Sequence, residues 1–330
     1  MHCESRRRFL TLTLVGLALS VGMLPQVSRA AGEFPDRPLA LVVPYPPGGS
    51  ADIIARLIAA EMTRNLGQNV IVENRAGASA IIGTDHVAKS APDGYTMIMG
   101  NVGSITIHPF TYRKLPYDPE KDLAPVSLLA TVDTVLVANP GLPVESIEDV
   151  IEFARKNPGK LTFSSSGVGS SPHLAGEFLK TRAGIDMRHI SYRGSAPALV
   201  DVIGGQVDLM LDNLPSSLPH ITQGKLRAIA VTGPERAKAL PDTPAIGETM
   251  KGFEVVSWQG ILVAAGTPAP IVTRLNTAVI EAAGDSAVRK RLGEMGVTVE
   301  TSTPEAFGQF IRRELTKWSE VVKAANVKLD

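Results

Sequence analysis

Cysteine is nearly absent from this 330-residue chain, whose one cysteine is Cys3. A single thiol cannot form a disulfide within the chain, so a disulfide-stabilised fold is excluded. The chain also has no excess of charge of either sign, since 33 basic residues balance 33 acidic ones. This balance argues against a function that depends on a polybasic surface, such as binding nucleic acid or a membrane. After residue 30, the sequence contains no apolar run long enough to span a bilayer.

The common sequence signatures of enzymes are missing as well. The chain has no G-x-S-x-G elbow, H-E-x-x-H motif, P-loop or G-x-G-x-x-G fingerprint. Beyond residue 30 the histidines lack metal-ligand spacing, so we predict neither a metal site nor a cofactor. One enzymatic interpretation stays open, in which His173 is a base beside Ser170. The alternative is that His173 simply lies in the first turn of a helix. The histidines concerned are His86, His108, His173, His189 and His220.

The first thirty residues have the layout of a secretory signal peptide. Arg6–Arg8 precede the apolar stretch Phe9–Leu24, and small residues at positions 28 and 30 fit a cleavage after Ala30. The segment Ser5–Leu10 also resembles the twin-arginine export signal, so either export route is open. An uncleaved anchor is the alternative, although the apolar stretch is shorter than a membrane span. We therefore expect an exported protein.

Strand-like and helix-like segments alternate from residue 39 onward. Leu39–Tyr45 is a short apolar run typical of a strand, whereas Ile54, Ile58 and Met62 recur at helical spacing. Such alternation predicts parallel sheets with helices on both faces, and the stretch 115–125 is expected to be irregular. We predict two α/β lobes, residues 31–135 plus 259–330 and residues 136–258. Two crossovers, near 131–140 and 253–264, would join them around a ligand cleft.

Four segments place glycine and polar side chains between a predicted strand and a predicted helix. Glycine lets the backbone approach a ligand closely. The first N–H groups of a helix lack partners within it and carry the positive end of its dipole. We interpret these loops as anion sites that face each other across the cleft, although each could be a purely structural turn. The segments are 43–52, 74–79, 163–173 and 192–197.

Asp212 follows a predicted strand at 207–211. Its carboxylate could meet an ammonium group of a ligand. It could equally cap the turn formed by residues 213–215. Both interpretations stay open from the residues alone.

The same loops belong to a longer series of ordered motifs. These are Phe34-Pro35-Asp36-Arg37-Pro38, Val42–Asp52, Val72-Glu73-Asn74-Arg75, Ala91–Thr96, Leu115–Pro119, His173–Glu177, Tyr192–Leu199, Gly204–Asp208, Gly224–Ala228 and Ala264–Pro270. Through these motifs the sequence resembles the extracytoplasmic solute receptors of tripartite tricarboxylate transporters, the Bug family. The resemblance runs along the whole chain after residue 33.

This resemblance implies a fold like that of type II periplasmic binding proteins, which close on a small carboxylate ligand. It also implies a location in the periplasm and a large and a small integral membrane protein as partners. We expect the receptor itself to be a monomer. In the family the carboxylate is held by the first strand–helix loops, partly through waters. Carried over, the implied ligand-binding residues are Tyr45, Gly49, Ser50, Asp52, Ala78, Ser79, Ser166, Gly169, Ser170, Ser171, Ser195 and Asp212.

The sequence departs from the family pattern at a few positions. The family usually has a Gly-Ala-Gly-Gly-Asn-like run where this chain has Gly77–Ile81, and usually has lysine at Arg193. Ile105 and His108 replace a histidine and an asparagine that are common there. We therefore predict a receptor for an organic acid or acidic amino acid without naming the ligand. The alternatives are a periplasmic enzyme that acts on a carboxylate and a ligand sensor for signalling.

Overall fold

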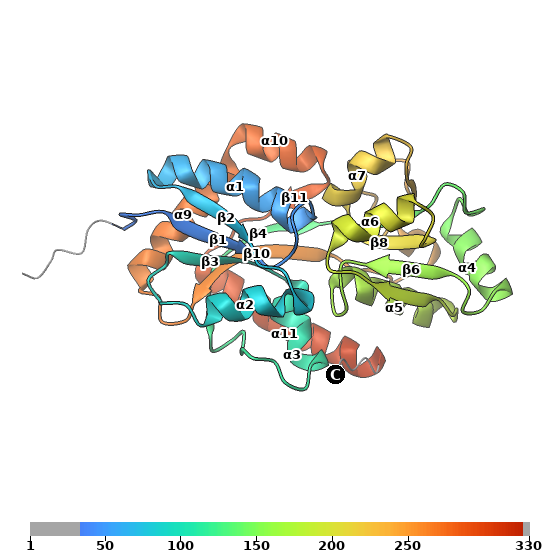
Figure 1. Ribbon diagram of the computed structural model, residues 1–330, viewed down its shortest axis with the longest axis horizontal. Coiled ribbons are helices and arrows are strands. Elements are labelled where there is room, and N and C mark those ends of the chain that lie inside the picture. The colour runs from blue at the N-terminus through green and yellow to red at the C-terminus, as the bar shows by residue number, and fades with distance from the viewer. Residues whose placement is uncertain (1–33, 326–330) are drawn as a thin grey trace, which may run out of the picture. The chain divides into compact units, whose positions relative to one another are not determined.

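The computed structural model describes residues 34–325, and the predicted signal peptide lies outside this range. Within the described residues, the chain builds two β-sheets that helices cover (Figure 1). The α/β class predicted from the sequence is confirmed.

The first sheet has six strands in the spatial order β11-β4-β10-β3-β1-β2. Strands β1, β2 and β3 are parallel neighbours, whereas β10 runs antiparallel to both β3 and β4. β11 pairs antiparallel with the outer side of β4. The strands are β1 (Leu39–Val43), β2 (Val70–Asn74), β3 (Thr96–Asn101), β4 (Leu123–Val132), β10 (Ser257–Ala264) and β11 (Val297–Val299).

The second sheet has five strands in the order β7-β6-β8-β5-β9. Strand β6 is parallel to β7 and β8, and β5 is antiparallel to β8 and β9. The strands are β5 (Thr134–Ala138), β6 (Thr162–Ser165), β7 (Arg188–Ser191), β8 (Leu209–Asn213) and β9 (Arg227–Val231). The first sheet thus draws its strands from 39–132 and 257–299, and the second from 134–231. This distribution supports the predicted lobe boundaries, which stay a prediction.

The prediction of parallel sheets is wrong for the strands that join the two sheets. Only Asp133 separates β4 from β5, and β10 later returns beside β4 in the opposite direction. A chain that leaves one sheet and comes back must place antiparallel strands there, so both sheets are mixed. The stretch 115–125 is irregular as expected up to residue 122, and its last three residues belong to β4, which begins at Leu123.

The helices begin and end where local chemistry dictates. In α1, the apolar Ile54, Ile58 and Met62 are fully buried, and the helix ends at Gly67 with φ 70°. Thr303 Oγ1 accepts from the Ala306 N–H at the start of α11. The longer helices are α1 (Ser50–Leu66), α2 (Ile81–Ala88), α4 (Ile147–Lys156), α5 (Ser171–Ala183), α6 (Ser195–Ile203), α7 (Leu214–Thr222), α9 (Ala269–Gly284), α10 (Ser286–Glu294) and α11 (Pro304–Ala325).

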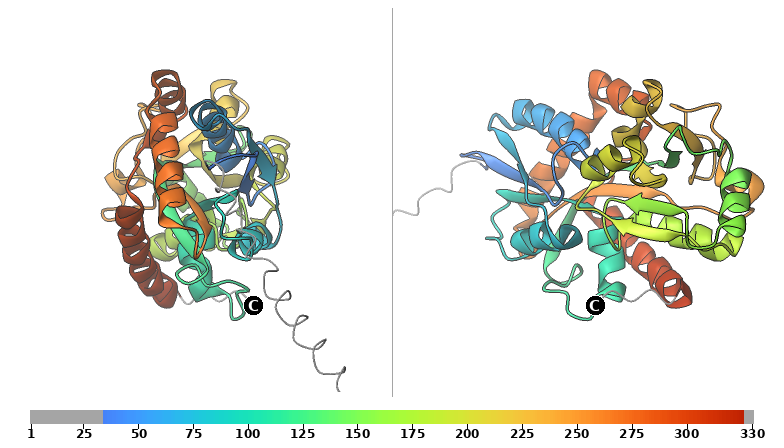
Figure 2. Two further views of the ribbon diagram at one scale, coloured as in Figure 1. Left: turned by 90° about the vertical axis from the view of Figure 1, so that its left-hand side faces the viewer. Right: turned by 45° about the vertical axis from the view of Figure 1, so that its right-hand side comes forward.

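Short helical turns complete the fold: η1 (Ala78–Ala80), a π-helix η2 (Val102–Ile107), α3 (His108–Thr111) and α8 (Ile246–Thr249). Figure 2 shows the C-terminal helices α9 and α11, orange to dark red, stacked along one side. There the buried Trp258 ring meets Phe307 edge-on at 5.7 Å. Between residues 34 and 325, no helix has both the length and the apolar character that a membrane crossing requires.

Candidate functional site

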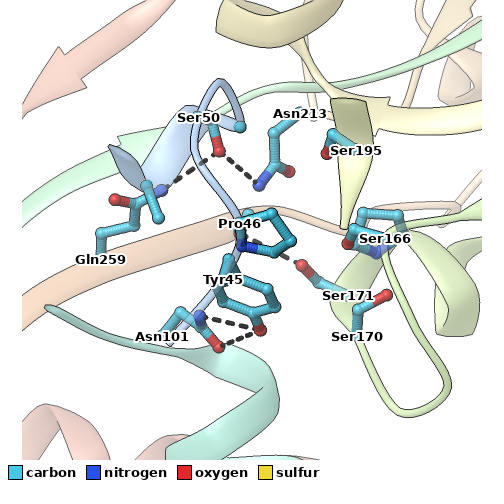
Figure 3. Close-up of a pocket in the computed structure, with 14 residues that line it drawn as sticks. Tyr45, Pro46, Ser50, Asn101, Ser166, Ser170, Ser171, Ser195, Asn213 and Gln259 are labelled. Carbon is cyan, nitrogen blue, oxygen red and sulfur yellow. Dashed lines mark hydrogen bonds between the residues drawn. The ribbon is translucent and has the colours of Figure 1, made fainter. Parts of the chain in front are cut away.

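A small pocket lies where loops of the two sheets meet (Figure 3). Its free space is about 30 Å³, which accommodates one or two water molecules. The pocket is lined by Tyr45, Pro46, Gly49, Ser50, Ala51, Asn101, Ser166, Ser170, Ser171, Pro172, Ser195, Asn213, Ser257 and Gln259.

Two helix N-termini reach this pocket from opposite sheets. Gly49 precedes α1 and Gly194 precedes α6, and neither helix has a side-chain cap. The N–H groups of their first turns therefore stay available for a ligand, and both helix dipoles direct positive potential at the pocket. The termini lie close together, since a Cβ added at Gly49 would be 3.9 Å from the Cβ of Ser195.

Ser50 contacts both halves of the site. Its Oγ accepts from Asn213 Nδ2 at 3.1 Å and from Gln259 Nε2 at 3.3 Å, as Figure 3 shows. A serine hydroxyl has two acceptor lone pairs and one proton to donate. Because both lone pairs are used, the proton of Ser50 is directed elsewhere. Ser50 is thus prepared to donate to an anion.

Tyr45 and Asn101 form the floor of the pocket. The Tyr45 hydroxyl lies 3.4 Å from Asn101 Oδ1 and 3.1 Å from Asn101 Nδ2. Asn101 Oδ1 also accepts from the Ser104 N–H at 3.1 Å, which caps η2. Burial raises the pKa of Tyr45 to about 12, so its hydroxyl stays neutral and able to hydrogen-bond.

Helix α5 brings two serines to the pocket. Ser170 caps the helix by accepting from the His173 N–H at 3.3 Å, and its own hydroxyl donates to the Gly167 carbonyl at 2.7 Å. Ser171 Oγ lies 3.1 Å from Ser257 Oγ on the returning strand β10. This hydrogen bond links a loop of the second sheet to strand β10 of the first sheet.

Seven of the twelve predicted ligand-binding residues come together in this pocket. They are Tyr45, Gly49, Ser50, Ser166, Ser170, Ser171 and Ser195. Ala78, Ser79 and Gly169 belong to adjoining loops but do not line it. Their loops lie against the rim, because a Cβ added at Gly167 would be 3.1 Å from Ser79 Oγ.

Asp52 lies in the first turn of α1 but away from the pocket lining. It is buried, and its carboxylate accepts from the Gly48 N–H, Arg56 and Asn74 at 2.9 to 3.1 Å. Burial alone would raise the pKa of Asp52, but these hydrogen bonds outweigh it and hold the pKa below its usual value. Asp52 therefore shapes the turn that presents Ser50.

Asp212 is fully buried and holds three hydroxyls. It accepts from Ser195 at 2.5 Å, Ser216 at 2.5 Å and Ser217 at 2.7 Å. Burial raises the pKa of Asp212, and the hydrogen bonds only partly counter this effect. With its oxygens engaged, Asp212 fixes Ser195 and the first turn of α7. The geometry resembles the predicted cap more than a contact with a ligand ammonium.

The sequence analysis did not select several lining residues. Asn101 and Asn213 stand at the carboxyl ends of β3 and β8, where polar residues of an α/β sheet often reach a ligand. Ser257 and Gln259 lie in β10, which is buried at every position. A polar side chain in such a strand is a signal that could have identified them. The other three are Pro46, Ala51 and Pro172.

The base and nucleophile of the enzymatic alternative are not arranged as a pair. The Ser170 hydroxyl donates to a carbonyl, and His173 Nδ1 accepts from the Gly169 N–H at 3.2 Å. Burial lowers the pKa of His173 to about 4, so the ring is neutral near pH 7. In the described part of the chain, no cluster of three His, Cys, Asp or Glu could hold a metal.

The sequence model of the "Tripartite tricarboxylate transporter family receptor" matches residues 54–327. The chain belongs to this receptor family. This confirms the resemblance seen in the sequence. The receptor is 36% identical to the protein BugT of Bordetella pertussis, with 96% of this chain and 98% of BugT aligned.

Two solved structures of Rhodopseudomonas palustris proteins are similar to this receptor. One, solved with adipate, is 38% identical with a TM-score of 0.87, and the match covers 89% of this chain and 99% of that one. The other, MatC with bound malate, is 34% identical with a TM-score of 0.84, covering 88% of this chain and 100% of that one. These similarities confirm the binding-protein fold.

Proposed function

We propose that this receptor captures small organic acids as carboxylate ions between the loops of its two sheets. The observation that carries the proposal is the meeting of the uncapped N-termini of α1 and α6 at one pocket. Each helix terminus contributes about 0.3–1 kcal/mol to a bound anion, and more when partly buried. The adipate and malate in the two R. palustris structures support the same ligand class.

An acid without an amino group suits the pocket better than an acidic amino acid. All fourteen lining residues are uncharged. Asp52 and Asp212 lie next in sequence to residues that line the pocket. Their carboxylates already accept hydrogen bonds from donors inside the protein. An ammonium ion would lose its hydration without gaining an ionic partner. Neutral donors suffice for a carboxylate, because backbone N–H groups and hydroxyls all donate to it.

Capture proceeds by closure of the loops around the acid. Hydrogen bonds already join the two sheets' loops at the pocket, from Asn213 to Ser50 and from Ser171 to Ser257, so the ligand enters an opened form. The ligand then binds the closed form better, because only closure brings donors from both sheets to the same carboxylate. Residues 31–135 plus 259–330 and 136–258 are the lobes that would move.

The receptor would act as a monomer in the periplasm and deliver its ligand to a large and a small membrane subunit of a tripartite transporter. Its family membership supports this assignment. Export by a signal peptide cleaved after Ala30 is part of the proposal. N-terminal sequencing of the exported protein tests it, and a lysine pair in place of Arg6 and Arg7 separates the twin-arginine route from the general one.

The test of the ligand class is a thermal-shift screen, followed by calorimetry. The panel comprises mono-, di- and tricarboxylates, aromatic acids and acidic amino acids. We expect stabilisation by acids without an amino group, and no product when the ligand is recovered after incubation. Ser50→Leu and Ser171→Leu should abolish binding, whereas the exposed Ser286→Leu should not. Unchanged affinity in both pocket variants would remove these loops from the site.

A further inference from the structure

Two histidines that the proposed function does not use lie behind the ligand loop, which we define as residues 165–171. His173 is 6% exposed, and its ring centroid is 4.2 Å from that of His189 on β7, with 36° between the planes. His189 also packs against the Phe163 ring of β6 at 4.9 Å. Nothing in ligand capture by neutral donors requires an aromatic pair that can ionise.

Each histidine is hydrogen-bonded to the ligand loop. His173 Nδ1 accepts from the Gly169 N–H at 3.2 Å, which places the proton of the neutral ring on Nε2. His189 Nε2 lies 2.8 Å from Ser165 Oγ. Ser165 in turn hydrogen-bonds to the carbonyl and the N–H of Gly167, at 3.2 and 3.3 Å. The pair therefore holds the loop at its first residue, Ser165, and at Gly169.

The ligand loop carries three of the residues that line the pocket, Ser166, Ser170 and Ser171. It also contacts the opposite sheet's loops, since a Cβ added at Gly103 would lie 3.1 Å from the Gly169 carbonyl oxygen. A displacement of Gly169 therefore moves the residues that line the pocket and also changes the contact with Gly103 of the opposite sheet's loop.

We propose that His173 and His189 form a pH-dependent clamp that holds the ligand loop in its binding shape when neutral and releases it when protonated. The inference rests on the proposed function, because the loop it controls lines the proposed ligand pocket. Protonation puts an N–H on His173 Nδ1, so that two donors face each other and the Gly169 N–H loses its acceptor. A second proton would place like charges on rings whose centroids are 4.2 Å apart. Acid conditions then lower ligand affinity.

The surroundings favour the neutral pair at ordinary pH. Burial lowers the pKa of His173 to about 4, and the positive charge of Lys180 adds to this effect. Burial, the neighbouring His173 and Lys180 together lower the pKa of His189 to about 3. Lys180 is on α5 and forms an ion pair with Glu177 at 3.0 Å. The groups that β6 presents to the pair, Phe163 and Ser165, are uncharged.

The first experiment uses no ligand, so it is independent of the proposed function. NMR follows the ring nitrogens of His173 and the hydrogen-exchange protection factor of the Gly169 amide from pH 7 to 3.5. The range is limited to the pH values at which the far-UV circular dichroism is unchanged. Protection of Gly169 should fall in step with protonation of His173. A Gly169 amide that stays equally protected while His173 titrates would overturn the clamp.

The second experiment compares variants with malate as the probe. Asn can replace Nδ1 of His173 with an oxygen acceptor, and Gln can reach the Nε2 position of His189. The double variant His173→Asn/His189→Gln keeps both contacts but cannot titrate. The ionisation of malate affects all proteins alike, so the wild type should lose several-fold more affinity between pH 7 and 3.5 than this variant. His173→Leu should bind weakly at both pH values. Identical pH profiles for wild type and double variant would refute the proposal.

Discussion

The side-chain amide of Asn213 donates a hydrogen bond of 3.1 Å to Ser50 Oγ. Asn213 ends β8 of the second sheet, and Ser50 begins α1 beside the first. The same oxygen accepts from Gln259 on the returning strand β10. One hydroxyl thus joins a loop of each sheet to the strand that connects them. The hydrogen bond from Asn213 orients the hydroxyl proton of Ser50. It forms only when the loops of the two sheets are close together.

We predict that Asn213→Ala weakens the binding of the best organic acid in the screen by about fivefold to tenfold. The change removes one hydrogen bond across the site, worth roughly 1 kcal/mol, and frees the Ser50 hydroxyl to rotate. Isothermal calorimetry measures the effect. The matched control is Asn157→Ala at the end of α4, where the amide contacts only its own helix at Phe153. Equal affinities for the two variants would contradict the prediction.

Gly103→Ala should weaken binding by hindering closure. A Cβ there would lie 3.1 Å from the Gly169 carbonyl oxygen and 3.5 Å from Ser170 Cα. The open form relieves the contacts with Gly169 and Ser170 but not the 3.3 Å approach to Asn101 Oδ1, so the ligand affinity should fall by roughly threefold to tenfold and the stability of the unliganded protein by a smaller amount. Calorimetry and thermal unfolding separate these effects. In Gly293→Ala on α10 the added Cβ meets nothing within 4 Å, and this control should bind normally.

The order of elements and half of the site were predictable because they depend on local sequence. Apolar spacing identified α1, and the glycine-rich turns located Ser50, Ser171 and Ser195. The strand partners were not predictable in the same way. The crossings near 131–140 and 253–264 were predicted, but the antiparallel pairing of β5 with β8 and β9, and of β10 with β3 and β4, which makes both sheets mixed, was not.

The roles of the acidic residues could not be predicted from the local sequence either. Asp52 and Asp212 stand in the right loops, but a sequence does not tell which donors will surround a carboxylate. Arg56 and Asn74 reach Asp52 from α1 and β2, and the hydroxyls of α7 reach Asp212. Only the folded chain shows that these oxygens face the interior.

Acid should destabilise the receptor through its buried histidines. Burial lowers the pKa of His108 to about 3, whereas the unfolded side chain has a pKa near 6.5. Below pH 6.5 the unfolded chain binds more protons than the folded one, so stability falls as the pH falls towards 3. Between pH 7 and 4.5 the free energy of unfolding should fall by roughly 2 kcal/mol less when Leu replaces His108 than in the wild type.

Urea unfolding at both pH values measures this difference. His86→Leu on the exposed face of α2 controls for the removal of a histidine. His108 Nδ1 is buried and finds no hydrogen-bond partner among the described residues, so Leu should not lower stability at pH 7. A variant with the same acid sensitivity as the wild type would assign the effect to other groups.

Ala78→Gly, at an exposed position of the short turn η1, should stabilise the receptor, against the usual effect of glycine. Ala78, Ser79 and Ala80 have φ values of 45°, 50° and 80°, in the left-handed region that disfavours a side chain. Glycine relieves this strain by roughly 1 kcal/mol, which exceeds the entropy it adds to the unfolded chain. Ala60→Gly, on the exposed face of α1, should instead cost about 1 kcal/mol. Urea unfolding at pH 7 measures the free energy of unfolding of both variants. A loss of stability in both would show that the loop is not strained.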